Sequence, residues 1–171
     1  GQRVLEGTPQ PLLFGALRRG RDPVTGRPVP FNSAFITDEG GRVTAAYDKV
    51  VLLAFGEYIP GVEYFPFIMK ALPYTSMFGR GTSTAPLPFN GYGLATIICY
   101  EDIVPSHVRR VMAPREGVRP HVLVNVTNDS WYGDTTEPPI HLAEAVFRSI
   151  EHRRALVRST NTGISALVDP A

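Results

Sequence analysis

The alternation of short apolar segments with helical patterns in the second half of the chain most constrains its fold. Residues 93–99 and 121–126 are apolar and short enough to be buried strands, and 164–168 is a similar segment. Between them, 103–112 and 140–157 repeat apolar residues at the spacing of one helix face. Strands that alternate with helices in this way predict an α/β fold built from packed layers.

The first half predicts antiparallel strands followed by a long loop region. Residues 12–17, 31–37 and 43–53 are extended segments separated by turn-forming residues, which is typical of hairpins. Residues 61–92 are crowded with Pro, Gly, Ser, Thr and aromatic side chains. We expect a lid or loop insertion there, with at most one short helix near 68–72.

Composition excludes several classes of protein. The 171 residues, 43% of them hydrophobic, suffice for one domain that spans 1–171. Seventeen basic and sixteen acidic residues give a formal net charge of +1, so we expect no nucleic-acid-binding surface. A single cysteine excludes an internal disulfide. No apolar run reaches the roughly 18 residues that cross a bilayer, so the chain by itself is expected to be soluble.

Cys99 is the first candidate for chemistry. It follows a predicted apolar strand and stands just before Glu101 and Asp102, which open the next predicted helix. A thiol at the amino end of a helix lies near backbone N–H groups and the positive end of the helix dipole, which stabilise a thiolate and an adjacent oxyanion. The alternative is an inert buried cysteine, because free cysteine is among the most often buried residues. Position alone leaves both interpretations open.

Lys49 and Glu57 form the second candidate pair. They lie on either side of a predicted turn, in the stretches Tyr47–Lys49 and Phe55–Glu57. A lysine in a poorly solvated cleft stays charged when a carboxylate compensates it, and such a cation can stabilise developing negative charge. The alternative is an exposed pair at the surface, worth under about 1 kcal/mol.

A polar and aromatic loop follows the predicted strand 121–126. We expect its residues Asn128, Trp131 and Tyr132 to line a pocket, because loops at strand ends gather at the ligand-binding edge of α/β sheets. His141, near the start of the next helix, is a further candidate for this lining, although a lone histidine there is usually structural. The alternative for the loop is an Asx-rich turn with a packed Trp. No second histidine or cysteine has metal-ligand spacing, so no metal site is expected.

Taken together, the motifs of this chain resemble a known family. They occur in the order Tyr47-Asp48-Lys49, Phe55-Gly56-Glu57, Ile98-Cys99-Tyr100-Glu101, Thr127 to Gly133, His141, and Arg158 to Ser165. Across nearly the whole chain this order is similar to that of the nitrilase-type domain of apolipoprotein N-acyltransferases. The resemblance implies an α-β-β-α sandwich, here incomplete at its N-terminus, with a Glu-Lys-Cys triad and no cofactor.

The resemblance also assigns roles to individual residues. It implies that Cys99 is the nucleophile, that Lys49 and the backbone N–H of Tyr100 hold the oxyanion, and that Glu57 and Glu101 give electrostatic support. The acyl donor is then a phospholipid, and the acceptor is the N-terminal amine of a diacylglyceryl-cysteine lipoprotein. The parent protein is expected in the bacterial inner membrane with this domain facing the periplasm. The oligomeric state stays open.

One element of the resembled family has no match here. Its general-base glutamate precedes a helix that leads into the first strand, and only eleven residues stand before residues 12–17. Glu6, the one acidic residue among them, is too close to the strand to take that role. We therefore expect the isolated chain to be an inactive fragment that also lacks the membrane helices. Two further hypotheses are a soluble amidase that hydrolyses a small C–N substrate and an inactive remnant that binds a partner.

Overall fold

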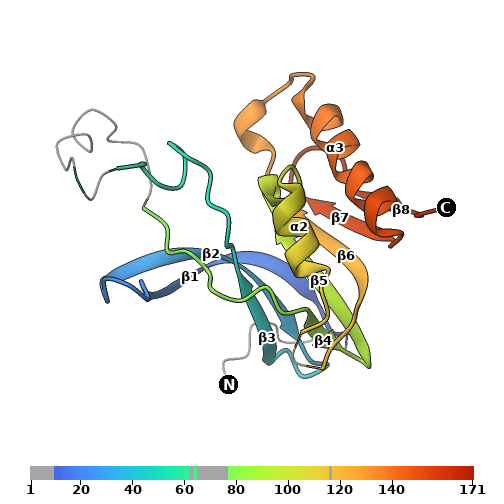
Figure 1. The fold of residues 1–171 in the computed structure, drawn as a ribbon, viewed down its shortest axis with the longest axis horizontal. Helices are drawn as coiled ribbons and strands as arrows, with labels where there is room; N and C mark the ends of the chain where they lie inside the picture. The colour runs from blue at the N-terminus through green and yellow to red at the C-terminus, as the bar shows by residue number, and fades with distance from the viewer. Residues whose placement is uncertain (1–9, 62–63, 65–76, 116) are drawn as a thin grey trace.

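The structure, a computed structural model, describes residues 10–61, 64, 77–115 and 117–171. Its strands form two sheets, a smaller antiparallel one and a larger mixed one (Figure 1). Part of the predicted lid at 61–92, the helix expected near 68–72 and Glu6 lie outside the described residues.

The smaller sheet is a meander of three antiparallel strands in the order β1-β2-β3. These strands are β1 (Leu13–Arg21), β2 (Pro28–Thr37) and β3 (Val43–Asp48). In the β1–β2 turn, the Asp22 carboxylate accepts the backbone N–H groups of Val24 and Thr25, which is an Asx turn. The hairpins expected for the first half are therefore present.

The larger sheet has five strands in the order β4-β5-β6-β7-β8. They are β4 (Leu87–Phe89), β5 (Tyr92–Ile98), β6 (Pro120–Thr127), β7 (Leu156–Thr160) and β8 (Ala166–Val168). The central strands β5, β6 and β7 are parallel, and the short edge strands β4 and β8 are antiparallel to them. The connections carry η1 (Cys99–Glu101), α2 (Pro105–Val111), η2 (Ser130–Tyr132) and α3 (Glu137–His152).

Two apolar cores hold these layers together. Between the two sheets, β2 and β3 pack against β4, β5 and β6 through Ala34, Ile36, Tyr47, Leu87, Ile98, Val124 and Val126. Between the larger sheet and its helices, the core consists of Ala95, Ile97, Val108, Val111, Leu123, Ala145 and Leu156. Alternate residues of β5 therefore serve different cores, as the period of two in a strand requires. The result is an α/β sandwich in which α2 and α3 cover one face (Figure 1).

The structure corrects several predicted boundaries and adds a short strand. The strands expected at 12–17 and 31–37 extend to Arg21 and begin at Pro28, because they pair with each other along their whole length. The helix expected at 140–157 begins earlier and ends at His152, because Arg153 takes a left-handed conformation with φ of 49° and the chain then enters β7. The strand expected at 43–53 ends at Asp48, where the backbone turns toward the larger sheet. The short strand β4 lies within the region expected to be a loop, because its three residues pair with β5.

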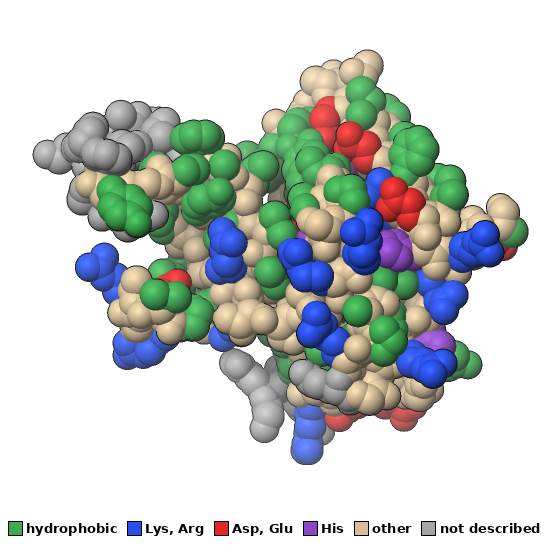
Figure 2. Space-filling model, viewed as in Figure 1, with side chains coloured by type: hydrophobic (Ala, Val, Ile, Leu, Met, Phe, Trp, Pro, Cys, Tyr) green, Lys and Arg blue, Asp and Glu red, His purple; other side chains and the backbone are tan. Residues whose placement is uncertain are grey.

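The surface carries basic and apolar side chains on several elements. On the face shown in Figure 2, Lys and Arg side chains are separated by neutral ones and form no continuous positive strip. Ile140, Phe147 and Ile150 of α3 are each more than half exposed. Within the described residues, no helix combines the length and the apolar character needed to cross a membrane.

Candidate active site

Cys99 lies where β5 ends and η1 begins, and its backbone is strained. Its φ of 51° is in the left-handed region, which costs a residue other than glycine roughly 1–2 kcal/mol. Its half-buried side chain packs at the edge of the core between the sheets. Such a conformation persists only when the surroundings hold it. Two buried residues just after the turn provide that support, because Glu101 accepts the N–H of Ile98 and the N–H of Asp102 donates to the Cys99 carbonyl.

Lys49, immediately after β3, is a buried cation with one carboxylate partner. Its side chain is 2% exposed, and its Nζ lies 2.7 Å from Glu57 Oε2. The other oxygen of Glu57 accepts a hydrogen bond from the Asn32 side chain at 3.2 Å. The chain therefore holds the ammonium between the sheets, and the alternative of an exposed surface pair is wrong.

The backbone around Lys49 is fixed on both sides. Its N–H donates to the Asn32 carbonyl at 2.8 Å, and its carbonyl accepts the N–H of Gly81 at 2.8 Å. A Cβ atom at Gly81 would stand 2.0 Å from the Asp48 carbonyl oxygen, so only glycine permits this approach. The loop after β3 is thus held against the 77–86 segment.

Lys49 and Cys99 act on each other electrostatically. Burial raises the pKa of the Cys99 thiol, while the Lys49 charge and hydrogen bonding from the Thr127 side chain and the Tyr100 backbone lower it. The balance leaves this pKa above its ordinary value. The thiol is therefore mostly protonated at neutral pH, and its reaction needs a proton acceptor.

Glu101 joins the Lys49 loop to the Cys99 turn. One of its oxygens accepts the N–H groups of Val50 and Val51, each at 2.8 Å, and the other accepts the N–H of Ile98 at 2.8 Å. The second oxygen also accepts the Tyr47 hydroxyl at 2.8 Å, and His107 Nε2 lies 3.3 Å from the first. One fully buried carboxylate therefore fixes both the loop that follows Lys49 and the turn that contains Cys99.

The predicted pocket-lining residues occupy different environments. The exposed Asn128 side chain accepts the N–H of Ser130, which is the Asx turn of the alternative interpretation. Trp131 is 85% exposed, whereas Tyr132 is half-buried with its ring edge against Tyr100, at 5.9 Å between centroids. His141 is fully buried and stacks on Tyr100, at 4.5 Å. Their role in a pocket stays a prediction.

Two surface hollows lie away from these residues. One borders β2 and β4 around Thr37 and Phe89, and the other borders β3 and the 82–88 segment. Neither has Cys99 or Lys49 in its lining. The pocket expected to be lined by Asn128, Trp131 and Tyr132 is therefore not one of these two.

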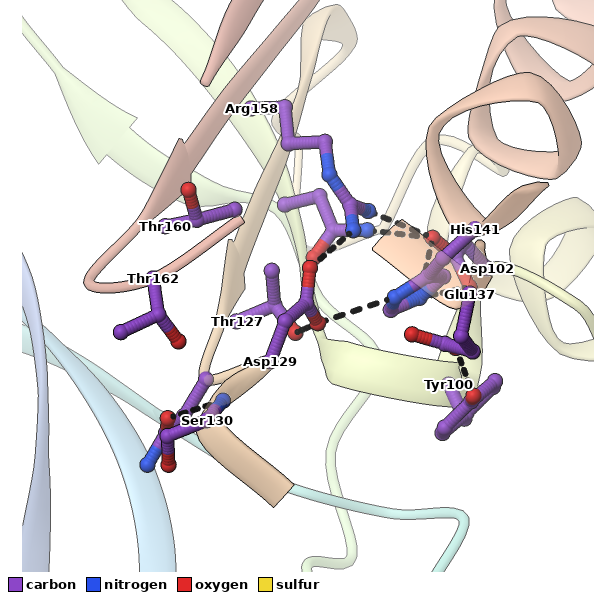
Figure 3. A network of polar contacts seen from close by, with 12 residues as sticks. Tyr100, Asp102, Thr127, Asp129, Ser130, Glu137, His141, Arg158, Thr160 and Thr162 are labelled. Carbon is purple, nitrogen blue, oxygen red and sulfur yellow. Dashed lines mark hydrogen bonds and ion pairs between the residues drawn. The ribbon is translucent and has the colours of Figure 1, made fainter. Parts of the chain in front are cut away.

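A cluster of buried charges lies on the helix side of the larger sheet (Figure 3). Arg158 of β7 donates from Nη1 to Asp102 at 3.1 Å and from Nη2 to Asp129 at 3.2 Å. His141 of α3 lies between the same carboxylates, with Nε2 3.2 Å from Asp102 and Nδ1 3.1 Å from Asp129. The Asn125 amide donates to Asp102 at 2.6 Å. All five side chains are at most 2% exposed.

Asp129, Glu137 and His141 offer atoms within 4.8 Å of one another, a spacing that a metal ion could bridge. Both ring nitrogens of His141 already face carboxylates, and Asp129 is also paired with Arg158. Asp129 and His141 are therefore engaged in ion pairs, and Glu137 accepts a hydrogen bond from the Tyr100 hydroxyl. We assign the group to the charge cluster and not to a metal centre.

Sequence analysis did not single out Asp102, Asn125, Asp129 or Arg158 as site residues. Asp102 and Asp129 follow the carboxyl ends of β5 and β6, whereas Asn125 and Arg158 lie within the parallel strands β6 and β7. Asn125 and Arg158 are direct cross-strand partners. The usable signal was the polar Asn125 within the apolar pattern at 121–126; for Arg158 there was none, because the helix expected at 140–157 covered the start of β7.

The carbon-nitrogen hydrolase family profile matches residues 11–171. The chain is 42% identical over 172 residues to the apolipoprotein N-acyltransferase of Bdellovibrio bacteriovorus and 36% identical over 172 residues to that of Brucella melitensis. These alignments cover 96% and 99% of this chain but 30% and 31% of those proteins. The chain thus spans about a third of the length of the curated relatives it matches.

Among solved structures, the chain is similar to an amidase from Nesterenkonia sp.. The TM-score is 0.60 at 23% identity, and the match covers 94% of this chain and 54% of the amidase. The stacked sheets, with a cysteine and a buried lysine at their facing ends, define a nitrilase-type α/β sandwich. Within that class, the chain belongs to the carbon-nitrogen hydrolase family.

Proposed function

We propose that the protein containing this chain is an N-acyltransferase that moves an acyl chain from a phospholipid to the N-terminal amine of a diacylglyceryl-cysteine lipoprotein. The observation that carries the proposal is the likeness to apolipoprotein N-acyltransferases over nearly the whole chain. The buried Lys49 whose charge acts on Cys99 supports the chemistry. We place the domain on the periplasmic side of the bacterial inner membrane, attached through parts of the protein outside this chain.

In the first half of the reaction, Cys99 gives up its proton and its sulfur attacks the ester carbonyl carbon. The Lys49 ammonium and the Tyr100 N–H, which points toward the sulfur, stabilise the oxyanion. The C–O bond then breaks, and the lysophospholipid leaves as an alcohol with the proton. The acyl group stays on Cys99 as a thioester.

In the second half, the amine of the lipoprotein attacks the thioester carbonyl. The same oxyanion site stabilises the negative charge, and the C–S bond breaks as the amide bond forms. The amine loses one proton, and the Cys99 thiol regains one. Each half therefore needs one group that accepts and returns a proton.

Neither Glu57 nor Glu101, the two acidic residues expected to support the reaction, is free to be this group. Glu57 pairs with Lys49 and accepts the Leu53 N–H and the Asn32 amide. Burial by itself raises the pKa of Glu101, but His107 and backbone N–H groups lower it below its ordinary value, so Glu101 stays ionised and fully hydrogen-bonded. We therefore predict no turnover by the purified 171-residue chain with phospholipid and lipopeptide. Measurable amide formation by that chain would contradict this account of the base.

The test of the proposed function is capture of the acyl-enzyme. The full-length protein is incubated with a phospholipid whose acyl chains carry an isotope label, then digested and analysed by mass spectrometry. We expect the label on the peptide that contains Cys99, released by neutral hydroxylamine as thioesters are. A diacylglyceryl-cysteine lipopeptide should then receive the label as an amide.

Two outcomes of this experiment contradict the proposal. If the label reaches only water and a small amide is cleaved instead, the protein is an amidase. If no label binds while the protein remains folded, the inactive partner-binding hypothesis is favoured. The likeness to the Nesterenkonia amidase does not separate these cases, because at 23% identity it shows the fold alone.

A further inference from the structure

The cluster of Asp102, Asp129, Arg158 and His141 lies directly behind the Cys99 turn. Asp102 ends that turn, and its N–H donates back to the Cys99 carbonyl at 3.4 Å. The cluster occupies the helix side of the sheet, while Cys99 packs toward the core between the sheets. Because its four charged members are at most 2% exposed, solvent screens their charges little.

Charge balance within the cluster depends on the state of His141. Two carboxylates face one guanidinium, so the four side chains are neutral only when the imidazole carries its proton. Glu137, half-buried on the same helix, adds a further negative charge within 4.8 Å. A neutral His141 would leave a buried excess of negative charge, which is costly.

Two contacts connect His141 to the reacting sulfur. Its ring stacks on Tyr100 with 4.5 Å between centroids and 14° between planes, and the Tyr100 N–H is directed at Cys99. In addition, the single proton of the Thr127 hydroxyl lies within reach of two acceptors, Asp129 at 3.1 Å and the Cys99 sulfur. The Tyr100 hydroxyl donates to Glu137, which holds the ring against α3.

We propose that His141 is a positioning residue whose protonated imidazole balances Asp102 and Asp129 and thereby favours the Cys99 thiolate and fixes the Tyr100 N–H beside it. The inference rests on the proposed function only in treating Cys99 as the nucleophile. The Asp102 charge raises the pKa of Cys99, so the positive charge that offsets Asp102 lowers it.

The pH dependence follows from the groups that face His141. Burial and the charge of Arg158 lower its pKa. The hydrogen bond and charge of Asp102, together with the charge of Asp129, raise it by more, so the pKa lies above its ordinary value. The stabilisation from this proton is thus fully present below about pH 6.5 and is lost as pH rises through the folded-state pKa. The effect on Cys99 disappears over the same range.

The test is the rate at which iodoacetamide alkylates Cys99 in the 171-residue chain, followed by mass spectrometry between pH 6 and 9.5. We expect His141→Gln to react about fivefold more slowly than wild type at pH 7. The difference between the two rates should shrink as pH rises, because the imidazole of wild-type His141 then loses the positive charge that the variant lacks at every pH. A change that is only structural would give a ratio independent of pH.

Two variants provide the comparison. His152→Gln exchanges another histidine of α3, remote from the cluster, and should leave the rate unchanged. Adding Asp102→Asn to His141→Gln removes one charge of each sign and should restore the rate to within about twofold of wild type. Equal rates for wild type and His141→Gln across the pH range would overturn the proposal.

A measurement on the unmodified protein covers the case in which the variants fail to fold. In the wild-type chain labelled with ¹⁵N in histidine, we expect His141 to show two ring N–H groups at pH 7. A ring with one N–H at that pH would equally overturn the proposal. Because neither experiment contains phospholipid, failure of the acyltransferase proposal would leave these results interpretable.

Discussion

Exchange of Lys49 for methionine is expected to slow formation of the Cys99 thioester about a thousandfold in the full-length protein. Methionine keeps the length of the side chain but removes the charge that stabilises the oxyanion. The Lys49 charge also lowers the pKa of Cys99, so its loss reduces the thiolate as well. Because both effects act at the reacting atoms, the loss should appear in kcat more than in KM.

Arg42→Met is the matched control for this experiment. Arg42 is exposed next to β3, so the exchange removes one positive charge from the same sheet without touching the site. We expect its single-turnover rate with labelled phospholipid to equal that of wild type. A loss below about tenfold for Lys49→Met would mean that the ammonium does not contact the oxyanion, and that its pairing with Glu57 is structural.

The fold was predictable where periodic apolar patterns decide it. β5, β6 and α2 lie within two residues of the segments expected at 93–99, 121–126 and 103–112. The end of α3 was not predictable, because its apolar pattern runs on into β7 and only three residues, the first of them the left-handed Arg153, separate the two elements. Local periodicity does not reveal where a chain leaves one element for the next when both are apolar.

The site was predictable only in part. Cys99, Lys49 and Glu57 could be found because each stands in a short motif, and the ion pair between Lys49 and Glu57 agrees with the expectation for these two residues. The role of Glu101 as a connection between two loops depends on contacts about 50 residues apart, which no local pattern encodes. The same holds for Arg158, whose partners Asp102 and Asp129 lie 56 and 29 residues away in the sequence.

Exchange of Arg158 for methionine is expected to lower the free energy of unfolding of the chain by about 3–5 kcal/mol. Arg158 is the one guanidinium within the cluster, and it pairs with two fully buried carboxylates. Methionine fills a similar volume, so the loss comes from leaving Asp102 and Asp129 with only His141 as a positive partner. Removing one member of a buried ion pair is costly because the remaining charge stays desolvated.

Urea unfolding followed by circular dichroism measures this loss, with Arg119→Met as the control. Arg119 is exposed just before β6, so its exchange should change the free energy of unfolding by no more than about 0.5 kcal/mol. A loss under about 1 kcal/mol for Arg158→Met would show that the two carboxylates become protonated or hydrated at little cost. The cluster would then be too weakly constrained to hold the Cys99 turn, and the strained backbone at Cys99 would need another support.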